Sequence, residues 1–420
     1  MRNPFKVGQP VPPESFVGRQ SLIDIAFDQI NNRSNLAIWG GPGMGKTSFL
    51  NLLKSEEVWQ SQEIDPSQAI IVYLNCLEIR PFIAANFWRK IIYSIGQKTK
   101  DDAIRQIIKK LLEKSKSTKD HLLYILRKIG EQNKFLVLLL DDYDTTLNSH
   151  PRYTKTDIEV FLTECRNLAY HSEERKYLSM IVTSLRRLNE KSPNITPDGS
   201  PWYNHFVFQP LKPLNDKEIG ILLSGIPMTG EVRDGIEEIA GGNPALLQNT
   251  GFLLYSKGRS GETLNAEIFA KEFVKATEHF FQDIWQLADK TEQALLMLIA
   301  LYQLKSRVQK TDYDLSDISI IFSQKERELM NLEERYVIQR TAEQENTNYS
   351  FTSTIMEWWV IKEIENTNTE ELKERELVFL KFMSRKQVDK VKDVINSLLE
   401  HKETIKSIAK WVGKLAPYLL

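Results

Sequence analysis

A glycine-rich segment, residues 40–47, reads Gly-Gly-Pro-Gly-Met-Gly-Lys-Thr and has the spacing of a phosphate-binding loop. Glycines let consecutive backbone N–H groups turn toward an anion without a Cβ clash. Lys46 would bridge the β- and γ-phosphates of a nucleoside triphosphate, and the Thr47 hydroxyl would coordinate Mg²⁺. The alternative is a structural strand-to-helix turn that contains Lys-Thr by chance. The candidate phosphate-binding residues are Gly41, Pro42, Gly43, Met44, Gly45, Lys46, Thr47 and Ser48.

Two acids, Asp141 and Asp142, directly follow an apolar segment at residues 135–140. Because acids at the end of a buried strand need cations, we predict that Asp141 holds the water shell of the Mg²⁺. Asp142 would orient or deprotonate the attacking water, which makes hydrolysis of the nucleotide the expected reaction. The alternative is that these acids only cap the next helix or turn, and we expect Asp144 to be a turn residue.

A third apolar segment, residues 178–183, leads into Ser184, Arg186 and Arg187. A polar residue at the end of this strand could sense the γ-phosphate. An arginine there could neutralise charge in the transition state, and Arg186 is the candidate catalytic residue. The alternative is that both arginines lie on a solvated loop.

Five short strands are expected, and helix-like sequence separates them. Such alternation is typical of a parallel sheet covered by helices, so we predict an α/β fold. The expected strands are residues 36–39, 70–74, 135–140, 178–183 and 205–208.

After Pro213 the pattern changes from strands to helices. Short helices are expected at residues 216–224, 231–240 and 244–255. A helix at 281–302, a second at 324–333 and strands at 336–340 and 349–353 follow in the order of a winged helix. The predicted domains are an extended proline-containing arm (1–15), a nucleotide-binding domain (16–212), a helical lid (213–276), a winged helix (277–366) and a helical C-terminal segment (367–420).

The composition restricts the protein's partners and its compartment. The 55 Lys and Arg nearly balance 56 Asp and Glu, and the formal charge of -1 gives no global attraction to nucleic acid or an anionic membrane. Cys76 and Cys165 lack metal-ligand or redox spacing, as expected for thiols in a reducing compartment. No apolar run approaches the roughly 20 residues that span a bilayer, and no signal-peptide core is present. We therefore predict a cytoplasmic protein without a membrane partner.

The chain resembles the STAND class of signal-transducing ATPases, close to the archaeal-type and origin-recognition branch of AAA+ proteins. The resemblance rests on Phe-Val-Gly-Arg at residues 16–19, the glycine segment with Asp141, the strand ending in Thr183 and Ser184, and Gly-Asn-Pro at residues 242–244. It implies ATP or ADP as cofactor, with adenine-side roles for Val17, Gly18, Arg19 and Pro244. It also implies the strand order 5-1-4-3-2 in a P-loop NTPase sheet.

Two departures from the family pattern bear on activity. Leu185 stands where the family often has its sensor arginine, directly after the Thr-Ser pair. The second acid is Asp142 where many relatives have Glu, and the shorter side chain has to lie closer to the water. Slow hydrolysis is therefore expected. No nuclease, protease or TIR domain follows, and the apolar end, Tyr418-Leu419-Leu420, would suit a piece of a longer protein.

The order of nucleotide domain, lid and winged helix favours a regulatory switch whose nucleotide state controls domain arrangement or assembly with a protein partner or with itself. The alternative is a DNA-binding loader or transposition-type ATPase. The expected recognition helix argues against it, because Lys325 and Arg327 lie among four glutamates there, and phosphate contacts require local positive charge. A third possibility is an assembly scaffold that only holds nucleotide.

Overall fold

The computed structural model describes residues 2–191, 201–226, 230–260, 266–305, 318–343 and 346–365. They form two compact units. The sheet unit comprises Pro10–Gly40 and Gly45–Leu211. The helical unit comprises Met1–Gln9, Gly41–Met44 and Lys212–Leu420. The expected helical segment 367–420 lies outside the described residues, and the boundaries of the five predicted domains stay predictions.

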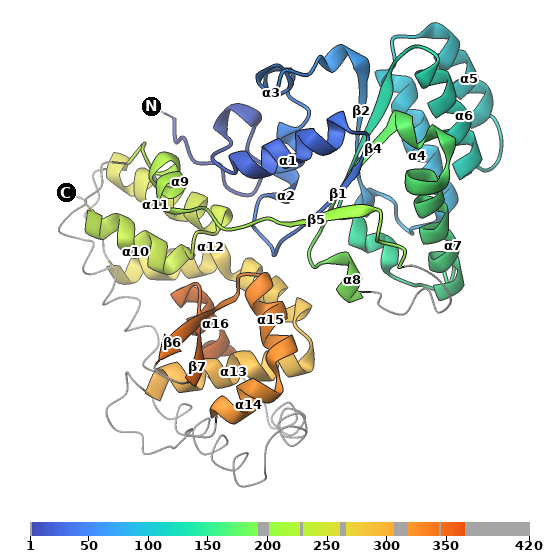
Figure 1. The fold of residues 1–420 in the computed structure, drawn as a ribbon. Helices are drawn as coiled ribbons and strands as arrows, with labels where there is room; N and C mark the ends of the chain where they lie inside the picture. Colours follow the sequence, from blue (N-terminus) through green and yellow to red (C-terminus); the bar gives the residue numbers. More distant parts are fainter. Residues whose placement is uncertain are drawn as a thin grey trace. The chain divides into compact units, whose positions relative to one another are not determined.

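A five-stranded parallel sheet forms the centre of the sheet unit (Figure 1). Its order, β2-β3-β4-β1-β5, confirms the predicted order 5-1-4-3-2, and β4 separates the strand of Asp141 from the strand before the glycine segment. Every residue of β1, β3 and β4 is buried, whereas burial alternates along the edge strand β2. The strands are β1 (Asn35–Trp39), β2 (Ala69–Asn75), β3 (Phe135–Asp141), β4 (Leu178–Ser184) and β5 (Phe206–Pro210).

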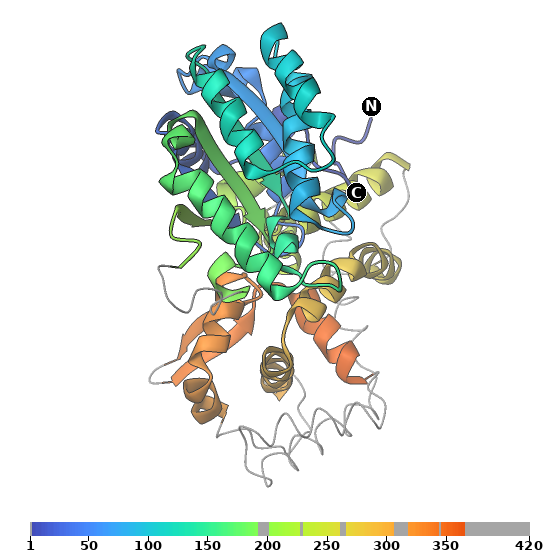
Figure 2. The ribbon, with the colours of Figure 1, turned by 90° about the vertical axis from the view of Figure 1, so that its right-hand side faces the viewer.

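Helices cover both faces of this sheet, as continuous apolar strands require. Figure 1 shows α1 to α3 on one side and α4 to α7 on the other, and Figure 2 looks onto the second side, with these helices in front of the strands. Leu136, Leu138 and Leu140 pack with α4, α6 and α7, so the alternate positions of β3, including Asp141, face the side of α2. The helices are α1 (Gln20–Asn31), α2 (Lys46–Leu52), α3 (Glu56–Ser61), α4 (Ala84–Lys98), α5 (Asp102–Leu112), α6 (Lys119–Gly130), α7 (Lys155–Arg166) and α8 (Leu188–Lys191).

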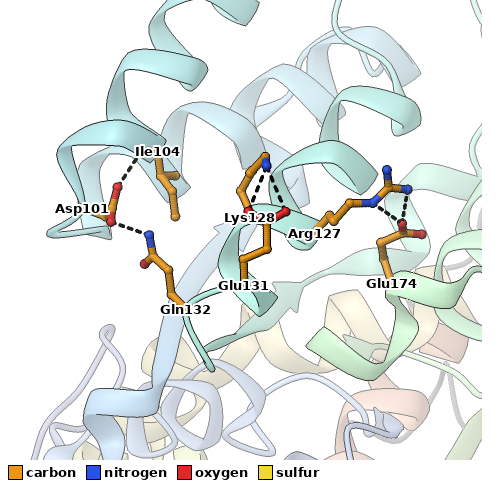
Figure 3. A network of polar contacts seen from close by, with 7 residues as sticks. All are labelled: Asp101, Ile104, Arg127, Lys128, Glu131, Gln132 and Glu174. Carbon is orange, nitrogen blue, oxygen red and sulfur yellow. Dashed lines mark hydrogen bonds and ion pairs between the residues drawn. The ribbon is translucent and has the colours of Figure 1, made fainter.

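Polar contacts fix α5 and α6 near the amino ends of β3 and β4 (Figure 3). Asp101 caps α5 by accepting a hydrogen bond from the Ile104 N–H at 2.7 Å, and it also accepts one from Gln132. Arg127 of α6 forms an ion pair with Glu174, 2.6 Å away, in the segment that leads into β4. These contacts lie at the amino ends of the strands. Asp141 is the last residue of β3 and lies at the opposite, carboxyl end of the sheet.

The helical unit has one continuous apolar core, to which Trp285, Trp358 and Trp359 contribute. Its two-stranded antiparallel sheet follows α15. The winged helix predicted for this order of elements stays a prediction. The elements are α9 (Asp216–Leu222), α10 (Gly230–Ala240), α11 (Pro244–Ser260), α12 (Ala266–Leu287), α13 (Lys290–Lys305), α14 (Ile318–Gln324), α15 (Glu326–Glu334), β6 (Ile338–Glu343), β7 (Asn346–Phe351) and α16 (Thr354–Glu365).

The single helix expected at residues 281–302 is wrong, because the chain forms two helices there, α12 and α13. Asp289 accepts a hydrogen bond from the Glu292 N–H at 2.8 Å, and Glu292 accepts one from the Asp289 N–H at 3.0 Å. This reciprocal capping box starts a new helix within an apolar pattern that reads as continuous. Within the described residues, no helix has the length and apolar character needed to cross a membrane.

The first residues of the proline-containing arm, which was predicted to be extended, pack into the core of the helical unit. Phe5 is buried against Gly251 of α11, and the Lys6 N–H donates to the Gln248 side chain at 2.8 Å. Within the expected extended arm, Pro13–Ser15 forms a short 3-10 helix. The arm is thus an integral part of the core at its start.

Replacing Gly251 with alanine is expected to destabilise the helical unit by about 1 to 3 kcal/mol, because the new Cβ would lie 2.5 Å from Phe5 Cδ1 and the ring would have to leave its place. Gly258→Ala in the same helix is the matched control. A Cβ there meets nothing within 4 Å, so helix propensity predicts a gain of about 0.5 to 1 kcal/mol. Urea unfolding of both variants measures the difference, and equal stabilities would contradict the packing of Phe5.

Candidate functional site

The glycine loop, residues 40–47, connects β1 to α2 in the position predicted for it. Gly43 and Gly45 have positive φ angles of 76° and 88°, which side chains with a Cβ rarely adopt. The buried Lys46 ammonium donates a hydrogen bond to the Gly40 carbonyl at 2.7 Å, so the side chain spans the loop from its end to its beginning. Burial lowers the pKa of Lys46, against the attraction of Asp142, Asp144 and Asp141.

The two predicted magnesium-binding residues lie together at the carboxyl end of the sheet. The Thr47 hydroxyl donates to Asp141 Oδ2 at 2.6 Å. Tyr73 donates to the same oxygen at 3.0 Å, and Thr183 donates to Asp141 Oδ1 at 2.5 Å. Three hydroxyl donors from α2, β2 and β4 therefore satisfy a carboxylate that has no exposed surface.

These oxygen donors fit Mg²⁺, which is usually bound by one or two carboxylates together with phosphates and retained waters. Thr47 and Asp141 are the residues that would hold it. Among the residues that the structure describes, no group of three or more His, Cys, Asp and Glu side chains could hold a metal ion by themselves. The oxygen donors of Thr47 and Asp141 suit a cation that phosphate oxygens and water also bind.

Asp142 adopts a left-handed backbone conformation with φ of 51°, directly after β3. Its N–H donates to Thr183 Oγ1 at 3.2 Å, and its Oδ2 accepts a hydrogen bond from Asn75 Nδ2 at 3.2 Å. Burial, followed by repulsion from Asp141, raises the pKa of Asp142. A carboxylate with a raised pKa is a stronger base, which suits the predicted role toward water.

Asp144 lies in a 3-10 helix, Tyr143–Leu147, where a turn was expected, and its side chain is buried. Its Oδ2 accepts a hydrogen bond from the Leu185 N–H at 3.4 Å. Asp144 therefore links the segment after β3 to the segment after β4.

Beyond β4, the two arginines differ in their surroundings. The Ser184 hydroxyl donates to the Arg186 carbonyl at 2.6 Å, which fixes the turn. The Arg187 guanidinium lies 5.1 Å from the ring centre of Phe208 and 5.5 Å from that of Trp39, a cation–π arrangement. The catalytic role of Arg186 stays a prediction.

The segment expected beside the adenine precedes α1. Gly18 and Arg19 both have positive φ, 74° and 63°. A Cβ on Gly45 would lie 3.2 Å from Arg19 Nη1, so the positive charge of Arg19 lies beside the last glycine of the loop. The adenine-side roles of Val17, Gly18 and Arg19 stay predictions. The Ser48 hydroxyl has a partner within the protein, because its Oγ accepts a hydrogen bond from the Val11 N–H at 3.1 Å.

Within the helical unit, the middle of the glycine loop contacts the Gly-Asn-Pro turn, residues 242–244. Asn243 Nδ2 donates to the Pro42 carbonyl, and the Ala245 N–H donates to the Gly43 carbonyl, both at 3.2 Å. Asn243 Oδ1 also caps α11, in which Pro244 is the first residue. A Cβ on Gly43 would lie 2.9 Å from both Ala245 Cβ and Asn243 Oδ1, so only glycine fits this contact.

Tyr73 and Asn75 were not predicted from the sequence as site residues. Both belong to β2, which was expected only as a strand. A usable signal exists nonetheless: polar residues at the carboxyl end of a parallel strand lie at the edge where ligands bind in open α/β sheets. Asn75 pairs in register with Asp141, which places β2 directly beside both acids.

The chain matches no protein-family model and no curated protein. Among solved structures it is similar to the Walker-type ATPase PABY2304 of Pyrococcus abyssi, with a TM-score of 0.54 and 16% identity over 85% of this chain and 99% of that chain. It is also similar to the Aeropyrum pernix ORC2 protein, solved as ADPNP-ADP complexes, with a TM-score of 0.49 and 12% identity over 94% and 97% of the two chains. The first likeness shows that the chain has the fold of a Walker-type ATPase.

Proposed function

We propose that the protein is an ATP-dependent switch of the STAND type, which binds ATP with Mg²⁺ and hydrolyses it slowly. The observation that carries the switch is the contact of the glycine loop with the Gly-Asn-Pro turn. The carbonyls of Pro42 and Gly43 accept hydrogen bonds from Asn243 of that turn and from Ala245 just after it, while the N–H groups of the same loop are those that would bind phosphate. A phosphate and the turn therefore act on the same peptide groups.

Each residue of the site has a distinct task in hydrolysis. Lys46 would leave the Gly40 carbonyl for the β- and γ-phosphates, and the buried setting strengthens that attraction. Asp142 would accept a proton from the attacking water. Mg²⁺, held by Thr47 and Asp141, would neutralise the charge of the phosphates. Arg186 remains the candidate cation for the transition state.

For the switch to work, ATP and ADP have to stabilise different arrangements of the helical unit by different free energies. Asn243 would couple the nucleotide site to the helical unit, because it caps α11 and bonds to the loop with the same amide group. Movement of the loop on phosphate binding would break or tighten these bonds. Pro244, at the start of α11, is retained as an adenine-side candidate from the family resemblance.

The DNA-binding alternative has less support. On the elements expected to read DNA, Arg340 pairs with Glu333 at 2.9 Å and Glu326 at 3.6 Å, and Lys325 pairs with Glu328 at 3.8 Å. Glutamates thus neutralise positive charge that phosphate contacts would need. A protein partner or self-assembly fits the switch better.

The deciding experiment measures bound nucleotide, turnover, and small-angle scattering of the full-length protein in ATP and in ADP. The switch predicts retained adenine nucleotide, slow turnover that DNA does not change, and scattering profiles that differ between the nucleotides. Identical profiles would contradict the switch, and strong stimulation by DNA would favour the loader.

Asn243→Ala is expected to reduce the difference in proteolysis between the ATP and ADP states, because the variant loses the amide bond to the loop. The loss of a helix cap also costs about 1 kcal/mol. Asn215→Ala is the matched control: Asn215 caps α9 in the same unit through the N–H groups of Lys217 and Glu218. If both variants lost the nucleotide-dependent difference equally, the bond to the loop would have no role in switching.

A further inference from the structure

The carboxyl end of α10 is capped only in part by the turn that follows it. The last four carbonyls of a helix have no donor within that helix. In α10 the carbonyls of Glu237 and Ala240 accept hydrogen bonds from the N–H groups of residues 241 and 243, at 2.7 and 2.9 Å. The two carbonyls between them, those of Glu238 and Ile239, need donors from elsewhere.

Those donors come from the turn between β7 and α16. The Ser353 hydroxyl donates a hydrogen bond to the Ile239 carbonyl. The Thr354 hydroxyl donates one to the Glu238 carbonyl at 3.3 Å. Ser353 is buried, and its Oγ also accepts a hydrogen bond from the Met356 N–H at 3.4 Å, in the first turn of α16. One hydroxyl thus joins the end of α10 to the beginning of α16.

Two consecutive glycines after α10 let three segments meet at one turn. Gly241 and Gly242 have positive φ angles of 56° and 72°. A Cβ on Gly241 would overlap the Thr352 carbonyl oxygen. A Cβ on Gly242 would lie 2.7 Å from the Leu214 carbonyl oxygen. The next residue, Asn243, bonds to the glycine loop, so residues 241–243 contact that loop, the beginning of the predicted lid and the predicted winged helix.

We propose that the predicted lid and the predicted winged helix move as one body when the bound nucleotide changes, and that the shared cap at Ser353 holds them together. This inference rests on the proposed function. The apolar core supports it, because Ile236 of α10 and Trp359 of α16 belong to one continuous cluster. A rotation between lid and winged helix would break both hydroxyl bonds and expose part of that core to water, whereas a rotation of the whole helical unit keeps them.

Distances between spin labels on the full-length protein test the single body. Labels are attached to cysteines introduced at exposed positions, as Ile221→Cys on α9, Gln324→Cys on α14 and Gln106→Cys on α5. The native cysteines are buried, so the introduced ones react first. With ADP and with a non-hydrolysable ATP analogue, the distance between labels at 221 and 324 is expected to stay the same. The distance between labels at 106 and 324 is expected to change.

A distance between 221 and 324 that changes with the nucleotide would overturn the single body and leave the switch of the proposed function standing. If neither distance changed, the switch itself would fail, and this inference with it.

Hydrogen exchange without nucleotide tests the shared cap by itself. Ser353→Ala is expected to speed amide exchange by about 5-fold, the scale of one hydrogen bond, both at residues 241–243 and in the first turn of α16. Thr354→Val removes only the bond to Glu238 and is expected to act in the same direction to a smaller extent. Thr277→Val is the matched control, because this buried hydroxyl donates to the Phe273 carbonyl within its own helix, α12, at 2.8 Å.

The control variant is expected to leave exchange at both sites unchanged. If Ser353→Ala sped exchange in α16 alone, Ser353 would be an ordinary cap of that helix, and the shared cap would be overturned. Faster exchange at both sites, together with a broader distribution of the distance between 221 and 324 in the same variant, supports the proposal.

Discussion

Lys46→Met is expected to lower ATP turnover by about 10³-fold, the order that a cation at the γ-phosphate contributes to phosphoryl transfer. Nucleotide affinity is expected to fall as well, because the lysine makes charge-assisted contacts with phosphates. The fold is expected to be retained. Burial lowers the pKa of Lys46, so the charged side chain is disfavoured where it lies and methionine of similar length removes that cost.

Isothermal titration with ATP, phosphate release and a thermal unfolding curve together test this expectation. Lys110→Met, on an exposed position of α5, is the control for removing one lysine without touching the loop. A Lys46→Met protein that binds and hydrolyses ATP at wild-type levels would exclude the glycine loop as the phosphate site. Loss of folding would instead show that Lys46 has a structural role at the Gly40 carbonyl.

The sheet could be predicted because its signals are local. Unbroken apolar runs indicate β3 and β4, and the glycine loop has a fixed spacing, so both Thr47 and Asp141 can be predicted as metal-binding residues from the sequence. The break between α12 and α13 was missed because the apolar pattern continues across it. Its signal is the capping box from Asp289 to Glu292, which depends on two side chains and not on periodicity.

Other features could not be obtained from local sequence, because they arise where distant segments meet. Tyr73 reaches Asp141 only when β2 pairs with β3 in a register that places Asn75 beside Asp141. Asn243 caps the helix that begins at the next residue, but its second bond, to Pro42, joins residues 201 positions apart in the chain. Local pattern fixes the elements, while the pairing between them decides which polar groups converge.

Asp142→Asn is expected to separate ATP binding from hydrolysis. Turnover is predicted to fall by about 10²- to 10⁴-fold, the range for loss of a general base, because an amide cannot accept the proton of water. The backbone should tolerate the change, since Asn adopts the left-handed conformation of this position readily. The amide oxygen can still accept the hydrogen bond from Asn75.

The stability of this variant follows from the direction of the pKa shift. Burial and Asp141 raise the pKa of Asp142 above its usual value, so its ionised form is disfavoured in the folded protein and costs stability at neutral pH. Removing that charge is expected to leave the thermal midpoint unchanged or higher, with ATP retained on the purified protein. Binding of Mg²⁺-ATP is expected to persist because Thr47, Asp141 and Lys46 are intact.

Single-turnover phosphate release, with nucleotide content measured on the same sample, gives the result. Asp157→Asn is the control. This acid caps α7 by accepting a hydrogen bond from the Thr154 N–H at 2.7 Å, takes no part in proton transfer, and its loss is expected to change turnover by less than about 5-fold. If Asp142→Asn hydrolysed ATP at the wild-type rate, another group would have to activate the water. If Asp142→Asn retained ATP, its scattering profile would report the ATP-bound arrangement of the protein alone, because no ADP would form.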